Sequence, residues 1–408
     1  MVFSLALRNV LRNKRRTLLT MAGIVAGTVS ILLLGGYYEY NYWGLRESFI
    51  RSQYAHVQIT KKGYWAKQEQ DPFAFMIPRS PDLVALLESQ GEVETVSAHL
   101  NYFGILDTAS GDSELVMVRG VDPERENGIN TFFTRKSGRD LVAGDLGFAE
   151  LGLALARKAN LDVGSDFSLS TVSSDGAQNA LPLKVKGMIG SYSADFDSKI
   201  LRIPLETAQI LAGADGVQEI VVLLKDTDKT ASFRNRILPL LREKGWDLEV
   251  TTWDQHAGYY AQVVQFYGGY FRLILMIVIV VVFFSTLNTM IMSIFERIAE
   301  VGTLRSFGTG RLLILAQFLC EGGVLGLAGT AAGVILAFVG ALVIRLAGGI
   351  PMPPPPGLTT SVAVQIMITP HNVAVACLIG VGVPLIASLL PSVHMVRTQI
   401  IDQIRHGS

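Results

Sequence analysis

Residues that could perform chemistry are few and scattered in this 408-residue chain. The sequence contains neither a GxxxxGK(S/T) phosphate-binding loop nor a GxSxG nucleophile elbow. Asp195 and Asp197 lie close together, and a solvated loop explains them better than a catalytic pair. The histidines lack metal-ligand spacing; they are His56, His99, His256, His371, His394 and His406. We expect a non-catalytic chain that binds no cofactor or metal.

One short segment concentrates charge between two long apolar runs. It reads Glu296-Arg297-Ile-Ala-Glu300-Val-Gly302-Thr-Leu-Arg305-Ser-Phe-Gly308. Glu296 and Glu300 share a helix face, where they repel each other unless a cation from elsewhere satisfies them. Gly302 and Gly308 allow the backbone to bend or to be approached closely. The segment is therefore either a docking element for a soluble partner or a plain loop closed by local Glu–Arg pairs.

Two polar residues, Asn288 and Glu321, lie inside apolar runs. An ionised side chain at the centre of a bilayer costs at least about 2.5 kcal/mol. We therefore expect Glu321 to lie near the membrane surface, where Arg305 or Arg311 could pair with it. A structural cap or a bond between helices is favoured for both residues over a role in a transport path.

Four segments could span a membrane, because about 20 mostly apolar residues cross the hydrocarbon core. Half of the residues are hydrophobic and 17% are charged, against about 25% charged in a soluble domain. The first segment lacks the A-x-A-like site of a cleaved signal peptide, so we expect it to be retained. The predicted spans are residues 18–38, 273–295, 312–344 and 373–390.

The orientation follows from the basic residues near the ends of the spans. One side carries Arg8, Arg12, Lys14, Arg15, Arg16, Arg297, Arg305, Arg311, Arg397 and Arg405. The other side carries Arg46, Arg51, Arg272 and Arg345. We therefore expect both termini in the cytoplasm, and the family resemblance described below implies a bacterial inner membrane. The cytoplasmic parts would be residues 1–17, 296–311 and 391–408, and a proline-rich loop at residues 345–372 would lie outside.

The N-terminal residues 1–17 combine apolar and basic residues at helical spacing. They predict either an amphipathic helix in the headgroup layer or simply the basic flank of the first span. Residues 39–272 alternate strand-like and helix-like patterns, which predicts a large α+β domain outside the membrane. The strand-like stretches are residues 56–60, 115–119, 181–189, 219–224 and 248–252, and the helix-like stretches are residues 81–89 and 229–244. This domain could have two lobes, with an insert at residues 120–212. Its ends, Glu39–Gln53 and Trp253–Arg272, predict helical stalks or an interfacial aromatic belt.

The third predicted span carries small residues at helical spacing, which let two backbones approach closely. They are Gly322, Gly326 and Thr330 in one row and Gly329, Gly333 and Ala337 in another. The rows could serve either a dimer contact or packing on the fourth span. Cys320 and Cys377 lie in apolar runs, so no disulfide framework is expected in the outer domain.

The charged segment ER-x2-E-x-G-x2-R-x2-G resembles the signature of the FtsX/MacB-like ABC transporter permeases. The similarity continues through Gln317 and Glu321 and into the tail at Ile400–Arg405. The outer domain is similar to the MacB-type core domain. Matching stretches are Arg119–Asp122, Gly138–Asp140, Ala143–Asp145, Leu153–Arg157, Lys186–Gly190 and Ile203–Leu205. Lipoprotein-releasing permeases are relatives, but commonly have aspartate where Ala299 or Glu300 stands here.

The resemblance implies a mechanotransmission machine of the type VII class. Two permeases, identical or paralogous, would pair in the bilayer above a cytoplasmic ABC ATPase dimer, which would bind ATP and Mg²⁺. The loop after the second span would be the coupling helix. Its contact residues would be Glu296, Arg297, Glu300, Gly302, Arg305 and Gly308. No ATPase domain precedes the first span, so we expect a separate ATPase chain.

The cargo implied by the resemblance is a periplasmic or membrane-derived substrate such as a lipoprotein, lipid, peptide or drug. A periplasmic adaptor or lipoprotein partner is possible, and the zero net charge gives no reason to expect nucleic acid. An alternative function is a transmembrane signalling scaffold that activates an outer partner such as a cell-wall hydrolase. A secondary transporter would need inverted repeats and broken helices, which the sequence does not show.

Overall fold

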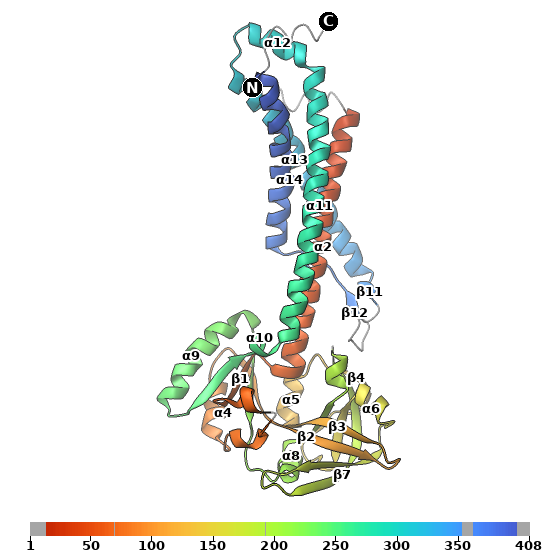
Figure 1. Ribbon diagram of the computed structural model, residues 1–408, viewed down its shortest axis with the longest axis vertical. Coiled ribbons are helices and arrows are strands. Elements are labelled where there is room, and N and C mark those ends of the chain that lie inside the picture. Colours follow the sequence, from red (N-terminus) through yellow and green to blue (C-terminus); the bar gives the residue numbers. More distant parts are fainter. Residues whose placement is uncertain (1–13, 69, 192, 353–361, 398–408) are drawn as a thin grey trace. The chain divides into compact units, whose positions relative to one another are not determined.

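The computed structural model describes residues 14–68, 70–191, 193–352 and 362–397 (Figure 1). The chain divides into two compact units. The membrane unit comprises Met1–Tyr42, Val263–Pro351 and Ala363–Ser408, and the outer unit comprises Trp43–Gln262 and Met352–Val362. The predictions for residues 1–13, for the proline run at 353–361 and for the tail at 398–408 lie outside the described residues.

The membrane unit contains four helices that are long and apolar enough to cross a bilayer. They are α2 (Lys14–Phe49), α11 (Gly258–Glu296), α13 (Arg311–Leu346) and α14 (Pro370–Arg397), with the short α12 (Ile298–Ser306) between α11 and α13. Four spanning helices with a large mixed domain between the first two were predicted, and this fold class is confirmed. Two short strands, β11 (Ile350–Met352) and β12 (Val362–Val364), pair with each other.

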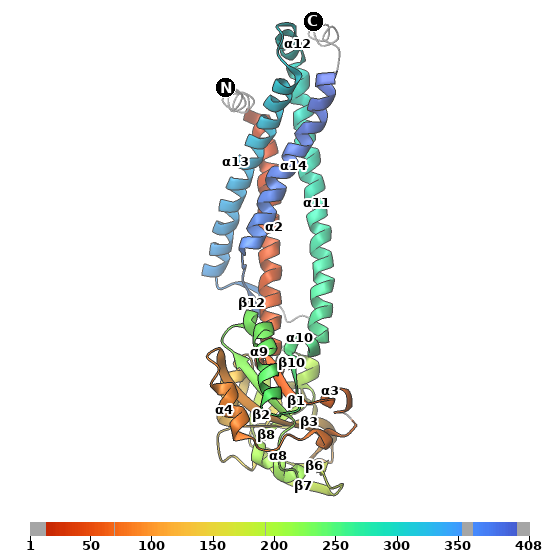
Figure 2. The same ribbon diagram turned by 90° about the vertical axis from the view of Figure 1, so that its left-hand side faces the viewer.

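The first two spanning helices are longer than a bilayer requires. At about 1.5 Å per residue, the 36 residues of α2 and the 39 of α11 exceed a hydrocarbon core of about 30 Å. Within the membrane unit they lie side by side (Figure 2), and Tyr38 contacts the rings of Tyr267 and Phe271. Both helices run unbroken through most of the segments expected as stalks, so each contributes residues to both units.

One row of α13 glycines lies against α14. A Cβ added at Gly322 would lie 2.6 Å from the Ser388 hydroxyl oxygen, and one at Gly326 would lie 3.1 Å from the Gly380 carbonyl oxygen. These distances leave little or no room for a side chain. Glycine therefore lets α13 and α14 approach closely, as small residues do in membrane helix pairs.

The second row of α13 glycines lies against α2. A Cβ at Gly329 would lie 2.8 Å from Cγ2 of Ile24, and one at Gly333 would lie 2.6 Å from Cβ of Thr28. The sequence left open whether these rows serve a dimer or the fourth span. The structure places them in contacts within the chain, with α14 for one row and α2 for the other.

The outer unit is built on a ten-stranded mixed sheet. Its strands follow the order β10-β1-β9-β2-β3-β8-β5-β7-β4, and β6 pairs with β2 and β7. The pairs β3–β8 and β5–β7 are parallel, and the other pairs are antiparallel. The strands are β1 (Val57–Lys61), β2 (Val93–Thr108), β3 (Ser113–Val121), β4 (Thr134–Gly138), β5 (Phe148–Gly152), β6 (Asp166–Val172), β7 (Gln178–Gly190), β8 (Ile200–Pro204), β9 (Glu219–Leu224) and β10 (Leu248–Thr252).

Short helices connect the strands. They are η1 (Ile50–Tyr54), α3 (Tyr64–Lys67), η2 (Pro72–Phe75), α4 (Pro81–Glu88), α5 (Pro123–Ile129), α6 (Leu153–Lys158), α7 (Ala194–Asp197), α8 (Leu205–Ala212), η3 (Thr227–Lys229), α9 (Thr230–Glu243) and α10 (Trp253–His256). The strands predicted at residues 56–60, 115–119, 181–189, 219–224 and 248–252 are confirmed. The helices predicted at residues 81–89 and 229–244 are also confirmed.

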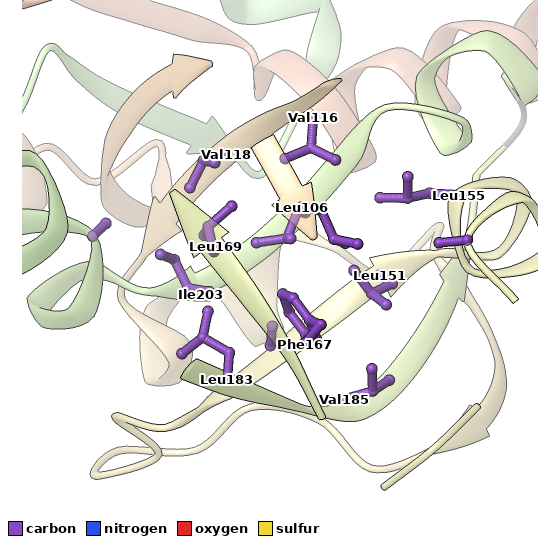
Figure 3. Close-up of a cluster of buried hydrophobic side chains, with 14 of the residues drawn as sticks. Leu106, Val116, Val118, Leu151, Leu155, Phe167, Leu169, Leu183, Val185 and Ile203 are labelled. Atoms are coloured by element: carbon purple, nitrogen blue, oxygen red, sulfur yellow. The ribbon is translucent and has the colours of Figure 1, made fainter. Parts of the chain in front are cut away.

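Two main hydrophobic clusters fill the outer unit. One cluster contains Leu106, Phe167, Leu169, Leu183 and Ile203 (Figure 3). Its members come from β2, β3, β5, β6, β7 and β8 and from the helices α6 and α8. The other gathers side chains from β1, β9, β10, α4 and α9. The sequence suggested two lobes, and the two clusters agree with that division, although one continuous sheet runs through both.

A larger side chain at Gly329 should destabilise the membrane unit, because it would enter the space that Ile24 fills. We expect Gly329→Leu to cost about 1–3 kcal/mol, as overpacking typically does. The matched control is Gly382→Leu on α14, where an added Cβ meets nothing within 4 Å. Thermal unfolding of the detergent-solubilised chain measures the difference. Equal midpoints for the two variants would contradict this packing.

Candidate functional site

The α12 segment is a helix held between two sharp changes of backbone direction. Arg297 leaves the helical conformation, with φ −117° and ψ 9°, and so separates α11 from α12. Gly308 has φ +90°, a left-handed conformation that glycine adopts without steric cost. The N–H groups of Gly308 and Thr309 donate to the carbonyl oxygens of Arg305 and Leu304, which closes the end of α12.

A buried ion pair fixes the start of α12 to α13. The Arg297 Nη1 donates to the Glu321 Oε1 over 2.7 Å, and the two side chains are only 6% and 4% exposed. The sequence suggested Arg305 or Arg311 as the cation for Glu321, whereas this ion pair is made by Arg297. Two charges removed from water stabilise a structure only when they satisfy each other. The pair therefore ties the α11–α12 junction to one position on α13.

The inner face of α12 is buried against the ends of α11, α13 and α14. Val301 belongs to a cluster with Ile294, Ile314, Phe318, Met395 and Val396. Gly302 and Arg305 are also buried. Three of the six predicted contact residues, Arg297, Gly302 and Arg305, thus lie on the side of the segment that faces the rest of the chain. These three residues can therefore support the conformation of α12 without being exposed to a partner.

The opposite face of α12 is exposed. Glu300, Thr303, Leu304 and Phe307 follow one another at i, i+3, i+4 and i+7, so they form a single stripe. The Leu304 and Phe307 side chains are 44% and 84% exposed. Glu296 and Gly308 are exposed as well. Sequence reasoning selected Glu300 but missed Leu304 and Phe307, although their spacing from Glu300 would have identified them.

The intramembrane polar residues occupy different environments. Glu321 is buried, as described above, whereas Asn288 lies exposed on α11. Its neighbour Thr289 faces α2, where its hydroxyl lies 2.6 Å from the hydroxyl of Thr20.

In the outer unit, the end of α2 is anchored through a polar relay. The Leu224 N–H donates to Nδ1 of His56 over 3.0 Å, so Nε2 must carry the proton of a neutral ring. That Nε2–H donates to the Thr227 hydroxyl over 2.9 Å, and the hydroxyl donates to Glu47 over 3.1 Å. Glu47 lies in the last turn of α2. The relay therefore joins the helix end to the sheet.

Hydrophobic contacts bring the beginning of α11 to the same place. Phe49 and Ile50 from the first segment share a buried cluster with Trp253 and Ala257, which precede α11. Val221 and Leu223 of β9 complete the contact with the sheet. Within the outer unit, both chain entries are thus packed on one strand.

A buried charged network lies beside this anchor. His99 Nε2 is 3.0 Å from Glu126, and Arg202 reaches Glu150 over 3.0 Å and Glu126 over 3.9 Å. Burial alone would lower the pKa of His99, but the Glu126 carboxylate outweighs it and raises that pKa. Burial would likewise raise the pKa of Glu126, but His99 and Arg202 lower it. Sequence reasoning missed this network because its members are far apart in the chain.

Asp197 was wrongly predicted to lie in a solvated loop with Asp195. Its side chain is fully buried, and both carboxylate oxygens accept from the Ser191 N–H at 2.8 and 3.0 Å. Asp195 is exposed and pairs with Lys199. Among the described residues, no group of His, Cys, Asp and Glu side chains could hold a metal ion.

Removing Arg297 alone should be more harmful than removing the whole ion pair. Arg297→Met leaves the Glu321 charge buried without this partner, and we expect a cost of about 3–5 kcal/mol. The double variant Arg297→Met with Glu321→Met should recover most of that loss. Unfolding in detergent of the wild type, both single variants and the double variant gives the coupling. Additive effects would show that the pair does not fix the segment.

The stability of the outer unit should fall as the pH drops below about 6.5. Burial, followed by Arg51 and Arg46, lowers the pKa of His56 to about 3. Below about pH 6.5 the unfolded chain therefore protonates His56, whereas the folded chain keeps the ring neutral. Unfolding becomes easier as the solution is acidified. The loss in the free energy of unfolding should approach 4 kcal/mol near pH 3.5, at about 1.36 kcal/mol per pH unit.

His56→Asn keeps an acceptor for the Leu224 N–H and should flatten this part of the plot of stability against pH. Tryptophan fluorescence during denaturation at each pH provides the measurement, and parallel profiles would refute the assignment to His56.

Comparison with known proteins agrees with this arrangement. Residues 17–240 match the MacB-like periplasmic core domain family, and residues 272–400 match the FtsX-like permease C-terminal family. The first match alone covers more than half of the chain. The periplasmic region of MacB from Actinobacillus actinomycetemcomitans gives a TM-score of 0.36 at 16% identity, covering 51% of this chain and 92% of that one.

Individual relatives are distant in sequence. The macrolide export ATP-binding/permease protein MacB of Chromobacterium violaceum is 25% identical over 82% of this chain, which spans 52% of that relative. The uncharacterised ABC transporter permease YvrN of Bacillus subtilis is 22% identical over 98% of both chains. The lipoprotein-releasing transmembrane protein LolE of Haemophilus influenzae is 23% identical over 63% of this chain and 62% of its own length.

The resemblance first indicated by the charged segment and the outer-domain motifs is therefore confirmed. The two family matches, at residues 17–240 and 272–400, together cover most of the chain. The chain belongs to the FtsX/MacB-like family of ABC transporter permeases.

Proposed function

We propose that this permease converts ATP hydrolysis by a separate cytoplasmic ABC ATPase dimer into movements of its outer domain. The observation that carries the proposal is the exposed stripe of Glu300, Thr303, Leu304 and Phe307 on α12. An acidic residue beside two exposed apolar side chains forms a small docking surface, in which aromatic anchors contribute most of the binding energy. ATP and Mg²⁺ would bind to the ATPase, because this chain has no phosphate-binding loop.

The inner face of α12 supports the second step of the proposal. The Arg297–Glu321 pair and the Val301 cluster attach the segment to α11, α13 and α14. A force applied to the exposed stripe would therefore move these helices with α12. A loosely attached loop would instead absorb the displacement.

The helix lengths and their anchors support the third step. α2 and α11 each contribute residues to both units, and the outer unit holds their ends through the Glu47–Thr227–His56 relay and the Phe49–Trp253 cluster. Displacement of either helix along its axis would be transmitted to β9 and the sheet. The cytoplasmic location of α12 and of both termini follows from the distribution of basic residues and forms part of this proposal.

The cargo class in this proposal is a periplasmic or membrane-derived amphiphile. A lipoprotein, lipid, peptide or drug would be moved or extracted outside the bilayer. The names of the relatives point in two directions, macrolide export for MacB and lipoprotein release for LolE. The permease would act as a pair, with a second copy or a paralogue beside it.

Changes on the exposed stripe of α12 should prevent binding of the ATPase without preventing membrane insertion. Glu300→Lys reverses the charge, and Phe307→Ala removes the most exposed aromatic side chain of the segment. We expect each variant to lose at least 10-fold in the amount of ABC ATPase that co-purifies with the tagged full-length chain. Mass spectrometry of the purified complex identifies the ATPase.

The matched control is Leu346→Ala, which removes an apolar side chain that is 78% exposed at the other end of α13. It should leave ATPase binding unchanged. If Glu300→Lys and Phe307→Ala retain full ATPase binding and ATP-dependent activity, the stripe is not the coupling surface.

A further inference from the structure

A layer of buried ionisable side chains covers one face of the outer sheet. His99 lies opposite Glu219 in the β2–β9 pair, and Arg202 lies opposite Arg119 on one side and Glu150 on the other. Burying charges costs free energy unless they balance one another. With a protonated His99, the layer contains as many cations as carboxylates. Its members, none more than 8% exposed, are His99, Arg119, Glu126, Glu150, Arg202 and Glu219.

His99 lies between two of these carboxylates. Its Nε2 is 3.0 Å from Glu126 of α5, and its Nδ1 is 3.7 Å from Glu219 of β9. A neutral imidazole has one N–H and one lone pair, so either tautomer turns a lone pair toward one of the carboxylates. Only the protonated ring presents an N–H to both. Burial would lower the pKa of His99, but Glu126 and then Glu219 raise it overall, which agrees with a ring that keeps its proton.

The other titratable groups around this ring keep one charge state near neutral pH. Arg119 of β3 is a permanent cation that opposes proton binding at His99. Tyr54 of η1 and Tyr64 of α3 interact with Glu219, and burial raises the pKa of both hydroxyl groups. His256 of α10 also interacts with Glu219, and burial lowers the pKa of that ring. A change of charge in this layer above about pH 6.5 is therefore assigned to His99.

The Glu219 carboxylate connects His99 to the end of the first stalk. Asn101 Nδ2 donates to Glu219 over 3.2 Å, and Asn101 Oδ1 accepts from Arg119 Nε over 3.0 Å. Arg119 Nη1 then donates to the Gln53 carbonyl oxygen over 3.1 Å. Gln53 lies in η1, which directly follows α2. A change at Glu219 is therefore passed to the backbone of the stalk end through three hydrogen bonds.

We propose that His99 is a proton-binding switch that sets how firmly the stalk end is held on the sheet. The protonated ring bridges α5 and β9, whereas the neutral ring leaves Glu126 or Glu219 without its donor. Loss of the proton therefore loosens α5 or the chain of bonds that leads to Gln53. Histidine can act in this way because its charge changes near neutral pH. The inference rests on the proposed function only in one step, that a loosened stalk end transmits less movement.

Amide hydrogen exchange of the full-length chain in detergent tests the switch. The pH is raised in steps from about 6 to about 9, and each rate is divided by that of an unstructured reference peptide. Protection of α5 (Pro123–Ile129) and η1 (Ile50–Tyr54) should fall at least about 10-fold as His99 loses its proton. His56 does not contribute, because its pKa of about 3 keeps that ring neutral in this range. A flat profile for both segments would overturn the proposal.

Glu219→Gln distinguishes a switch from a merely structural contact. The carboxamide can donate an N–H to Nδ1 of a neutral His99, so α5 and η1 should stay protected at alkaline pH. The matched control is Asp166→Asn, which makes the same change at a carboxylate whose side chain is 80% exposed. It should keep the pH dependence of the wild type. Equal loss of protection in Glu219→Gln and in the wild type would contradict the switch.

A second measurement examines the proton directly and needs no variant. In the wild-type chain labelled with ¹⁵N-histidine, an imidazolium signal should persist at about pH 7.5, one unit above the ordinary histidine pKa. A spectrum in which all six histidines are neutral at that pH would overturn the proposal.

Neither measurement requires the ATPase, so the two proposals can fail separately. A flat exchange profile in a chain that still binds the ATPase overturns the switch alone. A wild-type chain that binds no ATPase overturns the proposed function, whereas the pH-dependent protection of α5 and η1 would remain.

Discussion

The ion pair between Arg297 and Glu321 is the interaction on which the α12 segment depends. Without it, the segment would lose a buried charged contact beside the break in the helix at Arg297, and the hydrophobic cluster around Val301 would remain. A buried pair of charges tolerates little displacement, because separating the partners exposes each to a medium that solvates it poorly. This intolerance makes the segment suitable for transmitting force. The same bond gives Glu321, which lies within a long apolar helix, a buried cationic partner.

At its own attachment, the outer unit uses a neutral imidazole and a hydroxyl that lead to the Glu47 carboxylate, which also pairs with Arg51 over 3.1 Å. His56, Thr227 and Glu47 form a chain in which every donor has an acceptor, and the neutral ring of His56 is required by the Leu224 N–H. Fully satisfied buried networks are rigid, since each member restricts the orientation of the next. The hydrophobic cluster of Phe49, Trp253 and Val221 adds contact area around them. Both attachments are therefore stiff, which direct mechanical coupling between them would require.

Much of this arrangement could be predicted from the sequence. The apolar runs predicted the four spanning helices, because a bilayer imposes a minimum length that few other structures satisfy. Short strand-like stretches predicted β9 and β10 at their observed bounds. The charged string from Glu296 to Gly308 predicted a short helix between two spans. Each of these helices and strands is defined by residues that are close together in the chain, so the sequence pattern alone is enough to predict it.

The features that escaped prediction depend on residues distant in the chain. The sequence suggested Arg305 or Arg311 as the partner of Glu321 and missed Arg297, because the choice depends on the turn at Arg297. Asp197 reads as a loop carboxylate until the Ser191 N–H is placed beside it. The members of the His99 network lie on separate strands and helices. The direction that Leu304 and Phe307 face depends on which side of α12 meets α14, although their spacing was visible.

Close approach at glycines and bonds between polar groups, more than apolar surface, determine how the spanning helices of this chain pack against one another. The apolar surfaces of α11, α13 and α14 are equally compatible with lipid, so they select no particular arrangement. Selection comes from the close approach that Gly322 and Gly329 permit and from bonds such as Thr20–Thr289. Every additional polar group in the hydrocarbon excludes those arrangements in which it has no partner.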